Sequence, residues 1–116
     1  MLTLAAAWQA GTLPLAYAAR ALGAAALQLT PQESRDLCLT KPAAGVPIDD
    51  QIRVDQIRVR NLPTKPEEWI RVGWGWVRKA RLSGDPGFYV NVGSCIDEAL
   101  RLAPEHVAAR AVRGRV

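Results

Sequence analysis

Trp69-Ile70-Arg71-Val72-Gly73-Trp74-Gly75-Trp76 is the stretch that predicts the fold, and it holds three of the four tryptophans of this 116-residue chain. Trp69, Val72 and Trp76 recur at i, i+3 and i+7, which places them on one face of a helix. A second stripe, at i, i+4, i+7 and i+8, lies on another face and consists of Ile70, Trp74, Val77 and Arg78. Because a helix with two such stripes needs neighbours on two sides, the pattern predicts stacked helices.

An internal repeat extends this helical pattern along the chain. Residues 26–31 read Ala-Leu-Gln-Leu-Thr-Pro, and residues 99–104 read Ala-Leu-Arg-Leu-Ala-Pro. In both copies Ala lets another helix come close, the Leu pair faces the core, and Pro ends the helix. With Pro63 as a third stop, the prolines at 31, 63 and 104 are 32 and 41 residues apart. These distances bracket a period of about 34 residues if the last unit has a longer turn. The Gly- and Pro-rich residues 83–87 predict such a turn.

With these residues the chain resembles bacterial-type members of the tetratricopeptide repeat (TPR) family, whose signature is W-x2-L-G-x2-Y. The first helix matches the signature, with Val for Leu and Trp for Tyr, at Trp69, Val72, Gly73 and Trp76. The second helix and its stop match at Ile96, Ala99, Leu100 and Pro104. The resemblance implies an all-α fold of stacked antiparallel helix-turn-helix units, an α-solenoid that winds as a right-handed superhelix.

The period divides the chain, a single helical-repeat domain over 1–116, into units of about 1–31, 32–63 and 64–104 and a truncated unit 105–116. The unit 32–63 fits least well, because Pro42 and Pro47 shorten its first helix to one or two turns. Its second helix is expected from about Ile48 to Arg60, although the alternating residues of 52–60 also suit a β-strand. The truncated unit leaves an apolar face of Val107, Ala111 and Val112 for self-association or for further chain.

Residues 1–29 contain eleven Ala, seven Leu and a single charge, Arg20. Three interpretations stay open: a helical hairpin of the first unit, a signal peptide over 1–18 that ends at a small-x-small site, and a membrane span. The hairpin is favoured because no Lys or Arg precedes Arg20, and no span is expected because Gln9, Gly11 and Pro14 interrupt the apolar run. A hairpin predicts a cytoplasmic protein, whereas a cleaved signal predicts an exported or periplasmic one.

The residues that carry chemistry are few. Cys38 and Cys95 are expected as buried small residues or free thiols, and whether they form a bridge depends on geometry that spacing does not show. His106, the single histidine, is expected at a helix start, with no second metal ligand nearby. There is no Ser/His/Asp set, no carboxylate pair in an apolar context and no cofactor loop. The sequence therefore predicts no enzyme, no metal site and no cofactor.

Composition excludes wholesale disorder and collagen, because 49% of the residues are hydrophobic and 22% are charged. The resemblance implies a protein-protein interaction scaffold whose concave surface binds a partner peptide or helix. The groove residues it implies are Ile70, Trp74, Val77 and Arg78, with Arg115 from the next unit. Core packing is an equal alternative for Trp74, and Arg78, Lys79 and Arg81 fit a helix end, where cations complement the dipole.

The alternative function is binding to nucleic acid or another anionic surface through residues 53–81, which carry eight basic and three acidic residues. The cations available to it are Arg53, Arg58, Arg60, Arg71, Arg78, Lys79 and Arg81. Nucleic acid is the less favoured partner, because acidic residues are interspersed and no RNA-binding motif occurs. The identity of a protein partner is not predicted.

Overall fold

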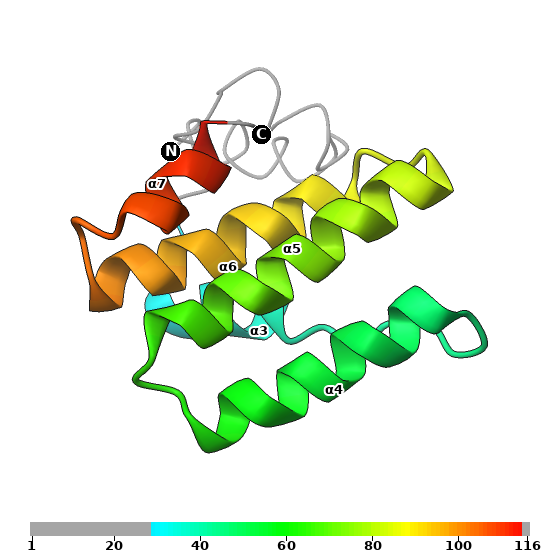
Figure 1. The fold of residues 1–116 in the computed structure, drawn as a ribbon, viewed down its shortest axis with the longest axis horizontal. Coiled ribbons are helices and arrows are strands. Elements are labelled where there is room, and N and C mark those ends of the chain that lie inside the picture. Colours follow the sequence, from blue (N-terminus) through cyan, green and yellow to red (C-terminus); the bar gives the residue numbers. More distant parts are fainter. Residues whose placement is uncertain (1–28, 115–116) are drawn as a thin grey trace, which may run out of the picture.

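The structure, a computed structural model, describes residues 29–114 of the chain. The described part is all α-helical, as expected, and neighbouring helices run antiparallel (Figure 1). The helices are α3 (Pro31–Cys38), α4 (Pro47–Asn61), α5 (Pro66–Ser83), α6 (Phe88–Leu102) and α7 (Val107–Arg113). Helix α4 covers residues 52–60, so the β-strand alternative is wrong there. The expected hairpin or signal within 1–29, and Arg115, lie outside the described residues except for Leu29.

Prolines lie at several of the helix ends. Pro63 and Pro104 follow the ends of α4 and α6, as the sequence predicts, whereas Pro31 is the first residue of α3. Thr30 caps α3: its hydroxyl accepts a hydrogen bond from the Glu33 amide at 3.1 Å, and its own amide donates to Glu33 Oε1 at 2.8 Å. Proline suits the first turn of a helix, where its missing N–H would have no intrahelical partner.

Helix α5 lies between α4 and α6, and its two glycines face opposite neighbours (Figure 1). A Cβ on Gly73 would lie 3.3 Å from the Cβ of Cys95 in α6. A Cβ on Gly75 would lie 2.8 Å from Cγ1 of Ile52 in α4. The absent side chains therefore let both neighbouring helices approach the backbone of α5 closely.

Five of the signature residues belong to the hydrophobic core. Trp69, Val72 and Trp76 are at most 2% exposed, and Ile96 and Ala99 on α6 are fully buried. Leu100 packs against this core and is half-buried, and Pro104 is exposed in the turn before α7. Helices α5 and α6 span the expected unit 64–104, and the turn between them occupies residues 84–87. Gly84 ends α5 with φ +69°, a left-handed conformation that favours glycine.

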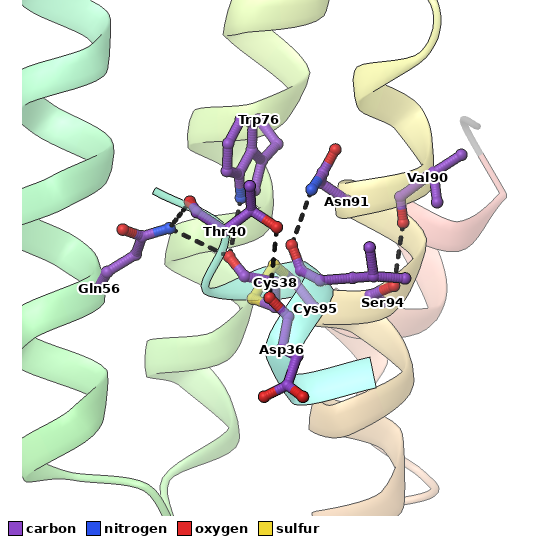
Figure 2. The surroundings of a disulfide bond; sticks show 10 residues. Asp36, Cys38, Thr40, Gln56, Trp76, Val90, Asn91, Ser94 and Cys95 are labelled. Atoms are coloured by element: carbon purple, nitrogen blue, oxygen red, sulfur yellow. Dashed lines mark hydrogen bonds between the residues drawn. A yellow bond between two sulfur atoms is a disulfide. The ribbon is translucent and has the colours of Figure 1, made fainter. Parts of the chain in front are cut away.

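Helix α3 packs mainly against α6 and also contacts α5. The expected unit 32–63 therefore does not form a hairpin in which α3 and α4 pack on each other. The reason is a connection that spacing does not show: the end of α3 is covalently tied to α6 (Figure 2).

Cys38, the last residue of α3, forms a disulfide with Cys95 in α6, so the expectation of free thiols is wrong. Both cysteines are fully buried, and the bond joins residues separated by 57 positions. In the chain-entropy model a loop of that size stabilises the fold by about 4 kcal/mol. The expectation that both residues are buried is confirmed.

Side chains from three helices hold the backbone around this disulfide (Figure 2). The carbonyl of Cys38 accepts from Trp76 Nε1 at 3.0 Å and from Gln56 Nε2 at 3.2 Å. The carbonyl of Leu37 accepts from Asn91 Nδ2 at 2.7 Å. The last carbonyls of a helix have no intrahelical partner, and here side chains of α4, α5 and α6 donate to two of them at the C-terminus of α3.

Candidate functional site

A solvent-open groove of about 380 Å³ lies between α4 and α5. The residues of α5 that line it follow helical spacing along one face of that helix, and those of α4 are one turn apart. Helix α4 contributes Gln51 and Asp55, and α5 contributes Glu67, Ile70, Arg71, Trp74 and Arg78. The groove therefore combines an indole, an aliphatic side chain, two carboxylates and two guanidinium groups.

Three of the implied groove residues, Ile70, Trp74 and Arg78, line this groove. They differ in exposure: Ile70 is 6% exposed, Trp74 is half-buried and packs against the core, and Arg78 is exposed. Val77 is 2% exposed and belongs to the core, because it lies one turn from Gly73 and Ala80, which are also buried on α5. Arg115 lies outside the described residues.

Sequence reasoning missed the contribution of α4. Gln51 and Asp55 belong to the tandem Asp-Gln-Ile-Arg-Val of residues 50–59, and they are four residues apart. That spacing puts both on one helical face once α4 is known to be a helix. Which neighbour this face meets depends on how α4 packs on α5, and the duplication alone does not show it.

Two buried carboxylates connect α4 and α5 through ion pairs. Asp49 is 1% exposed, and its Oδ1 accepts from Lys79 Nζ at 2.6 Å. Glu68 is 6% exposed, and its Oε1 lies 2.8 Å from Arg58 Nε and 3.5 Å from Arg71 Nε. Lys79 therefore does more than complement the dipole at the end of α5, since it neutralises a buried charge on the neighbouring helix.

Glu98 on α6 is the third buried carboxylate with cationic partners. It is 2% exposed, and its Oε2 lies 3.4 Å from Arg35 Nη1 and also binds Arg101. Arg101 donates hydrogen bonds to Glu98, and these bonds raise the pKa of Arg101. The pair from Arg35 adds a second link between α3 and α6.

Asp55 differs from these three carboxylates. It is 5% exposed, and Gln51 Nε2 donates to its Oδ1 at 3.2 Å. Within residues 29–114, Asp55 forms no ion pair, although Arg71 and Arg78 line the same groove. A buried carboxylate with a neutral partner therefore borders the groove.

Ion pairs also occupy part of the basic region that the nucleic-acid alternative needs. Four of its seven cations contact carboxylates, namely Arg53, Arg58, Arg71 and Lys79. The other three, Arg60, Arg78 and Arg81, are exposed. A cation that already neutralises a carboxylate releases fewer counterions from a phosphate backbone, so the pairing weakens that alternative.

His106 is the N-cap of α7, where the sequence predicts a helix start. The Ala109 amide donates to its Nδ1 at 3.3 Å, and its Nε2 lies 3.2 Å from Glu67 Oε2. Two interactions lower the pKa of the exposed Glu67 carboxyl group: a hydrogen bond at its backbone, which has the larger effect, and the bond with His106. Among the described residues, no group of three or more His, Cys, Asp or Glu side chains is arranged to hold a metal ion.

The apolar face expected on residues 105–116 is divided in α7. Val112 is 1% exposed and joins the core, whereas Val107 is 80% exposed and Ala111 is exposed. Ala109, which the expected face did not include, is fully buried. Self-association through the exposed part of this face stays a prediction.

No helix in the described part of the chain is long and apolar enough to cross a membrane. No protein-family model, curated protein or solved structure matches the chain. Function is therefore argued from the geometry and chemistry of the groove residues.

Proposed function

We propose that this protein is an interaction scaffold that holds a peptide or helix of a partner protein in the α4/α5 groove, with no chemistry of its own. The observation that carries the proposal is the groove itself, where a half-buried Trp74 lies among charged side chains of both signs. Tryptophan and arginine are enriched among the residues that contribute most to binding at protein interfaces. Trp74, Arg71 and Arg78 supply both residue types within one groove.

The TPR resemblance supports the same function. Helices α5 and α6 form an antiparallel pair in which six of the signature positions are buried, namely Trp69, Val72, Gly73, Trp76, Ile96 and Ala99. We infer that α4 to α7 represent a section of a right-handed TPR-like array, in which this stripe of α5 faces the partner. Helix α3 does not follow that arrangement, because it packs on α6 beside the disulfide.

The disulfide indicates the compartment in which this protein binds its partner. Disulfides persist in oxidising compartments and are rare in the cytosol, where thiols are kept reduced. The fully buried Cys38–Cys95 bond therefore favours an exported or periplasmic protein over a cytoplasmic one. This location agrees with the interpretation of residues 1–18 as a signal peptide.

A peptide-display selection against the immobilised full chain tests the proposed function. We expect the enriched peptides to bind Arg78→Glu about tenfold more weakly than wild type. The reason is that the new negative charge repels the peptide group that contacts Arg78 in the wild type. Arg81→Glu is the matched control, since Arg81 is exposed on the same helix and does not line the groove. Failure to enrich any peptide, or equal binding by wild type and Arg78→Glu, would contradict the proposal.

The same preparations can be titrated with a short single-stranded RNA at increasing salt. Tight RNA binding that weakens steeply with ionic strength would support the anionic-surface alternative instead. Weak RNA binding together with groove-dependent peptide binding is the expected result.

A further inference from the structure

Asp55 is the one buried carboxylate in residues 29–114 that has no cationic partner. Charged side chains are rarely buried without a partner of opposite charge, because removing an ion from water is costly. The other three buried carboxylates follow that rule, and Asp55 is the one that lines the groove. The exception therefore coincides with the candidate binding site.

Hydrogen bonds from the described residues use only part of the accepting capacity of Asp55, which borders the groove. Gln51, one turn earlier on α4, donates one bond to Oδ1. A carboxylate has about four lone-pair sites, and a neutral amide does not neutralise its charge. Of the guanidinium groups that line the groove, Arg71 contacts Glu68 and Arg78 is exposed, and neither forms an ion pair with Asp55.

We propose that Asp55 recognises a basic side chain, arginine or lysine, of the partner segment that occupies this groove. The cationic head group bonds to the Asp55 carboxylate, and the aliphatic stem lies along the half-buried indole of Trp74. Arginine fits best, since a guanidinium can bond a carboxylate with two parallel N–H groups and can stack on an indole. Binding then supplies the cation that the other buried carboxylates obtain within the fold.

The inference rests on the proposed function and makes it more specific. Arg78 is the last residue of α5 that lines the groove, and we expect it to contact an acidic or polar group of the same partner segment. The partner is therefore a peptide of mixed charge, with a basic residue that reaches Asp55. A purely acidic peptide would leave the buried carboxylate without a partner and would add a repulsive charge.

The test starts from peptides enriched on the wild-type full chain. We expect them to share an arginine or lysine, and we expect replacement of a shared arginine by citrulline to weaken binding about tenfold or more. Citrulline has nearly the shape of arginine without its charge, and this change leaves the protein untouched. The result is therefore interpretable whether or not any protein variant folds.

A double-mutant cycle with Asp55→Asn then identifies the contact. In this variant the citrulline replacement should change the peptide affinity little further, because the carboxylate that binds the arginine charge is absent. Asp50→Asn is the matched control: Asp50 is the corresponding residue of the tandem duplication, is exposed, and pairs with Arg53 outside the groove. It should preserve the full effect of citrulline.

The outcomes separate the two proposals. Enriched peptides that depend on Arg78 but lack a basic residue, or that bind equally with citrulline, would overturn the role of Asp55 and leave the groove as the binding site. Peptides that are insensitive to Arg78→Glu would overturn the groove itself, and the role of Asp55 with it. A citrulline effect that persists in Asp55→Asn would place the cation on another carboxylate.

Discussion

Ile52 on α4 packs directly against Gly75 on α5, where a Cβ on Gly75 would lie 2.8 Å from Ile52 Cγ1. Ile52 is fully buried and cannot move into solvent. The glycine thus sets how near α4 lies to α5, and with it the width of the groove that both helices line.

Gly75→Ala should destabilise the fold despite the better helix propensity of alanine. Overpacking a core costs about 1–3 kcal/mol, whereas Gly to Ala in a helix gains about 1 kcal/mol. Urea unfolding measures the balance. Gly93→Ala is the control, since its new Cβ meets nothing within 4 Å and should therefore stabilise α6. A gain in stability by Gly75→Ala equal to that of Gly93→Ala would contradict the close contact between Gly75 and Ile52.

The Cys38–Cys95 disulfide should be present in protein isolated under non-reducing conditions. Alkylation of the unfolded chain should modify neither cysteine until a reductant is added. Replacing both cysteines by alanine should lower the free energy of unfolding by about 2–5 kcal/mol, because the unfolded chain gains conformational freedom. Alkylation of Cys38 or Cys95 without reductant, or unfolding that is insensitive to reductant, would show that the bond does not form.

The buried carboxylates of α4 should respond oppositely to loss of charge. Asp49→Asn weakens a bond to Lys79 and should cost about 1.5–3 kcal/mol, the range for hydrogen bonds to charged groups. Asp55→Asn keeps an acceptor for Gln51 and removes a buried charge without a cationic partner, so stability should be equal or higher by about 0.5–2 kcal/mol. Thermal unfolding compares the two, and a large loss in Asp55→Asn would show that its charge is compensated within the fold.

A hydrogen bond at the Glu67 backbone and, second to it, the contact of Glu67 with His106 should make stability depend on acid pH. The pKa of Glu67 is below its ordinary value of 4.5 in the folded state. Its contribution to stability is therefore present above pH 4.5 and is lost as the pH falls through the lowered pKa.

Urea unfolding between pH 6 and pH 3 measures this dependence. Glu67→Gln should lose less stability than wild type over the acid part of that range, because it lacks the titrating group. Glu105→Gln is the control, because Glu105 pairs with Arg110 and not with His106. This variant should lose as much stability as wild type over the same pH range. Equal acid sensitivity of Glu67→Gln and wild type would show that the lowered pKa of Glu67 contributes nothing to the stability of the fold.

Part of the candidate site could be predicted from α5 alone. Ile70, Trp74 and Arg78 recur at helical spacing, so their common face follows from the period of the helix. Val77 does not follow this prediction, because it is also one turn from Gly73 and Ala80, which face the core. Asp55 could not be found, because its significance depends on the lack of a cation in three dimensions.

The sequence by itself determined the local structure: the tryptophan stripes of α5, the prolines at the helix ends and the glycine turn between α5 and α6. These features act within a few residues, where backbone sterics and helical periodicity are sufficient. Only the tertiary structure decided the pairing of Cys38 with Cys95, the packing of α3 on α6 and the position of Asp55 in the groove. Each depends on groups far apart in sequence, whose contact follows from how whole helices pack and not from local pattern.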